Sequence, residues 1–250
     1  MDNIVQSSVV HNLSRRPATV ATGPFVIGWD PTTDSRFVNY ATPLPGATVT
    51  PADVAVLVAA FRSIGRLPRL EYVTSCAPDL ERHLLDAGFI VEARNEYLTC
   101  SPATLRTPPD PAGVEIGEPT TDEERAGVVT AQNAAFGSER VAGPDDIARI
   151  RRAQRDGGVL VYARDLDGAY IGGGLASAPA VGLSEVTGIA VREPYRRRGI
   201  AGVLTALVTR RVFEAGAVGA WLEASGEDSW RVYERIGYAP TGRRLYIALD

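Results

Sequence analysis

One stretch of the sequence, residues 184–216, constrains the fold more than any other. Its first residues predict a strand over 184–191, which Pro194 interrupts. Apolar residues at helical spacing then follow from Ile200 to Val212. Gly216 stands where a helix commonly ends in a left-handed residue. The stretch therefore predicts a strand, a short loop and a helix in succession.

The loop between this strand and this helix has the composition of an anion-binding site. The first turn of a helix leaves backbone N–H groups unpaired and carries partial positive charge. Gly199 would let the backbone approach a ligand closely, and Ala201 keeps the first turn small. Three consecutive arginines add positive charge: Arg196, Arg197 and Arg198. A pyrophosphate is the ligand that we expect here, and a solvated basic turn is the alternative.

The motif in this loop is not one of the two common phosphate loops. The chain contains no lysine, so the G-x-x-x-x-G-K-[ST] loop is excluded, and no G-x-G-x-x-G follows a strand. What is present is Arg196-x-x-Gly199-x-Ala201, five residues after Val191. This motif resembles the acyl-CoA signature of the GCN5-related N-acetyltransferase (GNAT) superfamily. The segment 232–238, Val-Tyr-Glu-Arg-Ile-Gly-Tyr, resembles the Y-x-x-x-G-F segment of the same family.

This resemblance implies an α/β (α+β) fold with a mixed central sheet flanked by helices. It also implies acetyl-CoA as co-substrate. The loop would hold the pyrophosphate, and the end of the preceding strand would pair with pantetheine. The implied CoA-binding residues are Ile189, Ala190, Val191, Arg196, Arg197, Arg198, Gly199, Ile200 and Ala201. The family often has Asn after the following strand, where this chain has a serine-containing turn, so Ser229 or Ser225 is the expected substitute.

Two residues are candidates for the proton transfers of acyl transfer. Glu185 lies in an otherwise apolar or small-residue strand, eleven residues before Arg196, at the spacing of the general-base Glu in the histone-acetyltransferase branch of the family. A chain of water molecules is the alternative base. Tyr233 matches the family tyrosine whose hydroxyl approaches the CoA sulfur, and a packing role is its alternative.

Strand and helix patterns alternate along the whole chain, which is typical of α/β proteins. Three consecutive glycines, 172–174, lie within a predicted strand and indicate a bulge or a close backbone approach. The predicted strands of the N-terminal half cover 25–29, 37–40, 70–73 and 89–98, and its helices begin at Thr50 and Asp79. The C-terminal half has predicted strands over 114–116, 159–164, 170–176, 183–191, 217–224 and 243–249, with helices over 120–136, 144–157 and 229–236.

A proline-rich segment and a weak internal repeat predict two domains. Pro108, Pro109, Pro111 and Gly113 indicate a linker, so we place the domains at 1–108 and 109–250. The order strand, helix, Gly-aromatic, strand occurs twice, over 70–98 and over 221–247. The first copy has Leu84 where the second has Tyr233, and no R-x-x-G-x-A motif precedes its helix. The resemblance therefore implies a tandem arrangement, in which a truncated, degenerate GNAT-like domain precedes an active GNAT domain.

Composition narrows the classes of partner. The net charge of −4 makes nucleic acid an improbable partner, and no apolar run is long enough to span a membrane. The two cysteines, Cys76 and Cys100, form neither a disulfide framework nor a metal site, so we expect no metal and no covalent cysteine intermediate. We expect a cytoplasmic enzyme that is a monomer or a homodimer.

The function that follows is acetyl-CoA-dependent N-acetylation of a primary amine on a small molecule, by direct attack in a ternary complex. Protein or peptide N-acetylation is one alternative, and a non-catalytic acyl-CoA sensor is another. Segments 136–146 and 238–244 are expected to bind the acceptor, because they correspond to the variable parts of the family.

Overall fold

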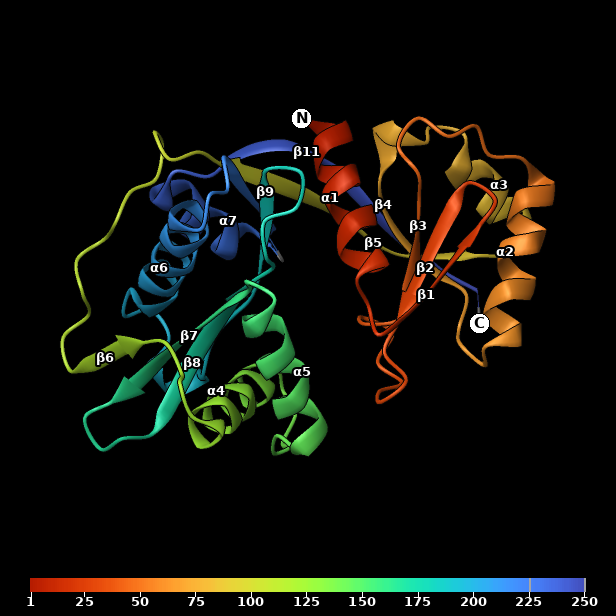
Figure 1. Ribbon diagram of the computed structural model, residues 1–250. Coiled ribbons are helices and arrows are strands. Elements are labelled where there is room, and N and C mark those ends of the chain that lie inside the picture. The colour runs from red at the N-terminus through yellow and green to blue at the C-terminus, as the bar shows by residue number, and fades with distance from the viewer. Residues whose placement is uncertain (225, 250) are drawn as a thin grey trace. The chain divides into compact units, whose positions relative to one another are not determined.

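The computed structural model describes residues 1–224 and 226–249. It divides into two compact units, the first formed by Met1–Tyr97 and the residues from Thr241 on, and the second by Leu98–Pro240. Helices flank mixed strands in both, so the expected fold class is confirmed (Figure 1). The domain boundary between 108 and 109 stays a prediction; the compact units separate between 97 and 98, and the last strand groups with the first unit.

The first unit is a sheet in the order β1-β2-β3-β4-β11-β5, with helices on both faces. Buried side chains from α2 and α3 form one core with alternate residues of the strands, and α1 packs on the opposite face. β3 and β4 run parallel, and β11 pairs antiparallel with β4. The elements are α1 (Asp2–Ser14), β1 (Ala18–Thr22), β2 (Phe25–Trp29), β3 (Tyr40–Pro43), α2 (Pro51–Ser63), β4 (Arg69–Val73), η1 (Thr74–Cys76), α3 (Leu80–Asp86), β5 (Ile90–Cys100) and β11 (Ala239–Ala248).

Local patterns did not predict the start of this unit. α1 and β1 were not foreseen, and the strand expected over 37–40 begins only at Tyr40. α1 is rich in Ser, Asn and Val, which have modest helix propensity, so tertiary contacts stabilise it. Its Gln6 is fully buried and donates to Thr42 Oγ1 and to the Pro43 carbonyl, both at 2.7 Å.

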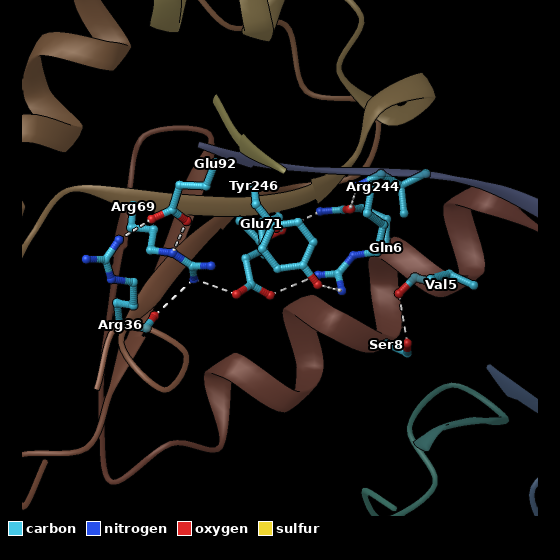
Figure 2. A network of polar contacts seen from close by, with 11 residues as sticks. Val5, Gln6, Ser8, Arg36, Arg69, Glu71, Glu92, Arg244 and Tyr246 are labelled. Atoms are coloured by element: carbon cyan, nitrogen blue, oxygen red, sulfur yellow. Dashed lines mark hydrogen bonds and ion pairs between the residues drawn. The ribbon is translucent and has the colours of Figure 1, made fainter. Parts of the chain in front are cut away.

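The face of the first sheet on the α1 side carries a buried ionic network (Figure 2). Glu71 of β4 accepts hydrogen bonds from Arg69 on the same strand and from Arg244 on β11, and all three residues are buried. Arg69 Nε also donates to Glu92 at 2.7 Å. Buried ion pairs of this kind cost desolvation energy, and removal of one partner leaves an uncompensated charge. The network therefore favours one pairing of β4 with β11, in which Glu71 lies opposite Tyr246.

The second unit is a sheet in the order β5-β10-β9-β8-β7-β6, to which β5 contributes its last residues. α6 and its apolar core lie on one face, and α4 and α5 pack on the other. β6 to β9 run antiparallel in sequence, whereas β9 and β10 are parallel. The elements are β6 (Val114–Gly117), α4 (Asp122–Ala135), α5 (Pro144–Arg155), β7 (Val159–Asp165), β8 (Tyr170–Ala176), β9 (Leu183–Val191), η2 (Glu193–Tyr195), α6 (Ile200–Glu214), β10 (Gly219–Glu223) and α7 (Glu227–Ile236).

The two copies of the internal repeat, 70–98 and 221–247, correspond to β4-α3-β5 and to β10-α7-β11. The elements that precede each copy also follow one order. In each unit a strand is followed by a helix and then by a strand parallel to the first, β3-α2-β4 in one and β9-α6-β10 in the other. Within the described chain, no helix is long and apolar enough to cross a membrane.

Candidate functional site

Strands β9 and β10 pair over only part of their length. Their register joins Leu183–Glu185 to Gly219–Trp221, and both strands continue beyond it. The main-chain groups of β9 from Val186 onward therefore lie outside this parallel ladder. The expected pairing of Ile189, Ala190 and Val191 with a ligand stays a prediction.

A bulge interrupts β9 in the same region. The register with β8 passes from Gly173 opposite Ala190 to Leu175 opposite Thr187, so β9 carries one extra residue. Gly188 within the bulge has a φ of +63°, a conformation that side chains disfavour. The predicted bulge or close approach at the glycine triplet is confirmed, because a Cβ on Gly174 would lie 2.5 Å from Ile189 Cδ1.

The loop after β9 leads directly into the N-terminus of α6 (Figure 1). Gly199 is the N-cap with a φ of +80°, and no side chain caps this helix end. The space where a Cβ on Gly199 would lie is open to 4 Å. Ile200 is buried beneath the first turn, and Ala201 is half-buried. The first N–H groups of α6 therefore point into a region that an anion can approach.

The three arginines of the loop differ in what they contact. Arg196 donates from Nε to the Val191 carbonyl at 3.0 Å and from Nη2 to the Ala135 carbonyl at 2.9 Å. Its guanidinium thus joins the end of β9 to the end of α4, an architectural role that the motif alone did not indicate. Arg198 lies over the Tyr195 ring and reaches the Ala112 carbonyl at 3.4 Å, and Arg197 has a φ of +64°.

Glu185 and Tyr233 belong to different faces of the second sheet. Val186 packs in the core beneath α6, so alternation along β9 directs Glu185 to the opposite face, where α4 lies. Glu185 is half-buried, and it is the last residue of β9 that pairs with β10. Tyr233 projects from α7 into the core beneath α6. A substrate that passes between β9 and β10 would therefore lie between these two groups.

Tyr233 is 8% exposed, and burial raises the pKa of its phenol to about 12. Its ring lies 6.3 Å from that of Tyr238, whose hydroxyl bonds Thr209 Oγ1 at 2.6 Å. Among the described residues, none hydrogen-bonds the Tyr233 hydroxyl. The hydroxyl is protonated at neutral pH and can donate a proton to a ligand.

The turn before α7 was expected to supply a serine for pantetheine. Ser229 lies in the first turn of α7, where its Oγ donates to the Gly226 carbonyl at 3.3 Å. Ser225 lies outside the described residues. At the other end of α7, Gly237 has a φ of +100°, and a Cβ there would lie 1.9 Å from the Thr104 carbonyl oxygen. This position therefore requires glycine.

Gln132 on α4 was not foreseen from the sequence. It is buried, and its Nε2 donates to the Gly188 carbonyl of the β9 bulge at 2.7 Å. The only available signal was a polar residue one turn after the apolar pair Val128 and Val129, and that pattern names no partner. In residues 1–224 and 226–249, no group of three or more His, Cys, Asp or Glu side chains is arranged to hold a metal ion.

Comparison with known proteins finds a family match over part of this chain. Residues 127–238 match the acetyltransferase (GNAT) family. A GCN5-related N-acetyltransferase from Kribbella flavida is 27% identical with a TM-score of 0.80, covering 100% of this chain and 96% of its own. None of the curated protein sequences matches.

Two more distant structures have a similar fold. A GCN5-related N-acetyltransferase from Sphaerobacter thermophilus is 16% identical, with a TM-score of 0.64 over 90% of this chain and 80% of its own. A tandem GNAT protein from the clavulanic acid biosynthesis pathway is 15% identical, with a TM-score of 0.63 over 98% and 86%.

Proposed function

Since residues 127–238 belong to the acetyltransferase (GNAT) family, we propose that the protein transfers an acetyl group from acetyl-CoA to a primary amine of a small molecule. This proposal rests on two features that occur together in the segment formed by β9, the following loop and α6. β9 separates from β10, and the strand then leads through a glycine N-cap into an uncapped helix. The first feature suits pantetheine and the second suits pyrophosphate.

The residues present fit CoA at this place. The N–H groups of the α6 first turn would bind the pyrophosphate, with Arg197 and Arg198 adding positive charge. The part of β9 beyond its ladder with β10, at Ile189 and Ala190, would pair with the pantetheine amides, whereas the Val191 carbonyl accepts from Arg196. Held in this way, the thioester lies beside the acceptor, and proximity alone lowers the barrier by several kcal/mol.

Acyl transfer requires the acceptor amine to lose a proton and the departing sulfur to gain one. Glu185 would accept a proton from the ammonium form of the acceptor, so that the amine nitrogen can bond to the acetyl carbon. As the C–S bond breaks, Tyr233 would give its proton to the departing sulfur, and the acceptor nitrogen loses its second proton to solvent. Both thiols of the chain are buried, and burial raises the pKa of Cys76 and Cys100, which favours direct attack over a cysteine intermediate.

Glu185→Gln should lower kcat by about 10²-fold at neutral pH, because the amide cannot accept the proton of the acceptor. CoA affinity should stay near that of the wild type, because Glu185 lies on the sheet face opposite the α6 core. Steady-state kinetics over a range of pH, with calorimetric titration of CoA, measure both. Unchanged turnover at every pH would assign deprotonation to water or to another group.

CoA should bind once per chain, in the second unit. The helix that corresponds to α6 in the first unit is α2, whose N-terminus is closed by its own residues. Thr50 Oγ1 accepts from the Asp53 N–H at 3.3 Å, and the Asp53 carboxylate accepts from the Thr50 N–H at 2.8 Å. Pro51 contributes no N–H, and the Asp53 charge would repel a phosphate. Calorimetry should give one site, and a stoichiometry near two would contradict this reading of the first unit.

The proposed function is tested by release of free CoA from acetyl-CoA in the presence of amines, amino acids, aminoglycosides and peptides. Release with a small amine, and an acetylated product detected by mass spectrometry, is the expected result. Release only with peptides would favour protein or peptide acetylation. Tight CoA binding with no release under any condition would favour an acyl-CoA sensor.

A further inference from the structure

Gln132 is a buried polar residue on an apolar face of α4. Val128, Val129 and Ala131 around it are buried, and Gln132 itself is only 6% exposed. A side-chain amide in such surroundings destabilises the fold unless it is hydrogen-bonded. The hydrogen-bond partner of the Gln132 amide therefore matters for the stability of the second unit.

The partner is the carbonyl of Gly188, at 2.7 Å from Gln132 Nε2. Two glycines on neighbouring strands make room for this contact. A Cβ on Gly188 would lie 3.1 Å from Gln132 Nε2, and a Cβ on Gly173 of β8 would lie 3.3 Å from Gln132 Cδ. Side chains at either position would crowd the amide, so the local sequence suits a glutamine that reaches the backbone of the bulge.

The contact fixes the orientation of one peptide group. In a planar trans peptide, the carbonyl of Gly188 and the N–H of Ile189 point in opposite directions. Because the carbonyl points to α4, the Ile189 N–H points away from α4. The N–H therefore points to the face of the sheet on which the Ile189 side chain packs against the α6 core. Gly188 is outside the register with β8, and glycine rotates more freely than other residues, so without a clamp this peptide could turn.

We propose that Gln132 is a positioning residue that holds the Gly188–Ile189 peptide with its N–H turned toward the carbonyl oxygen of the acyl donor. This inference rests on the proposed acetyl transfer. Negative charge develops on that oxygen as the amine attacks, and a donor that is already oriented stabilises it without reorganisation. Gln132 does not touch the acyl group. It acts through the backbone of β9.

Gln132→Met tests the clamp, because methionine has a similar volume and no N–H donor. We expect kcat to fall about 10-fold to 10²-fold. The affinity for free CoA should not change, because free CoA has no acyl oxygen. Amide ¹⁵N relaxation should show greater mobility of Ile189. The matched control is Gln154→Met on α5, whose amide bonds the Pro119 carbonyl at 3.2 Å, and it should leave kcat and the mobility of Ile189 unchanged.

Gln132→Glu separates the hydrogen bond from packing, because it predicts a pH dependence of activity that a packing role would not produce. An ionised carboxylate cannot donate to the Gly188 carbonyl, whereas a protonated one can. Burial beside an acceptor raises the pKa of the introduced carboxyl, so its donor function is present below that pKa and is lost as pH rises through it. Activity relative to the wild type should therefore fall with rising pH.

The possible outcomes separate this inference from the proposed function. An unchanged mobility of Ile189 in Gln132→Met, or a pH-independent activity ratio for Gln132→Glu, would overturn the clamp. Increased mobility with unchanged kcat would overturn its role in positioning. Failure of the wild type to release CoA with any amine would instead count against the proposed function, and the relaxation measurement would still decide whether Gln132 holds the peptide.

Discussion

Gly199→Val is expected to abolish detectable CoA binding while the chain remains folded. Gly199 has a φ of +80°, so a valine there is strained by about 1–2 kcal/mol. Apart from Gly199 itself and its two chain neighbours, no described residue has a heavy atom within 4 Å of the new Cβ position, so the Cβ meets no distant part of the chain. The branched side chain would instead occupy the space above the first turn of α6, where the pyrophosphate must approach. Calorimetric titration measures binding, and circular dichroism and Tm report the fold.

Gly216→Val is the matched control for this experiment. Gly216 follows the other end of the same helix, with a φ of +95° and open space at its Cβ position. The two variants should therefore lose similar stability, while only Gly199→Val loses CoA. If Gly199→Val binds CoA as the wild type does, the phosphate site has been assigned to the wrong loop.

Tyr233→Phe should lower kcat by about 10²-fold with little change in CoA affinity or Tm. The substitution removes one oxygen and keeps the ring in the core beneath α6. With its pKa raised to about 12, the phenol is protonated at neutral pH. It can then donate to a departing thiolate, whose free pKa is about 8.5. Steady-state kinetics would show the loss in kcat, because the proton is needed only as the thioester breaks.

Tyr238→Phe is the contrasting variant, because the hydroxyl of this neighbouring tyrosine is held by Thr209. Its removal leaves a buried group without its partner and should cost about 1 kcal/mol of stability with near-normal turnover. Full activity in Tyr233→Phe would exclude that residue as the acid.

The parts of the site that could be predicted from the sequence are those formed by neighbouring residues. The strand, loop and helix of 184–216 were foreseen because the apolar spacing, Gly199 and Gly216 each act on residues that are close to them in the sequence. The helix at residues 2–14 was missed, because its stability comes from burial against distant strands.

The contacts that were not predicted join distant parts of the sequence. Gln132 meets Gly188, and Arg196 meets the Ala135 carbonyl, only after the sheet and α4 have packed. A motif names the residue types of such a site, but the fold decides which backbone atom each side chain reaches.

The placement of β11 has a consequence for the order in which the protein can fold during synthesis. In the first unit, β11 lies between β4 and β5, yet most of its residues follow the whole second unit in the sequence. Domains usually fold as they emerge, from the N-terminus onward. Here Glu71 meets Arg244 only after the second unit has been synthesised, so the unit that is begun first is completed after the other.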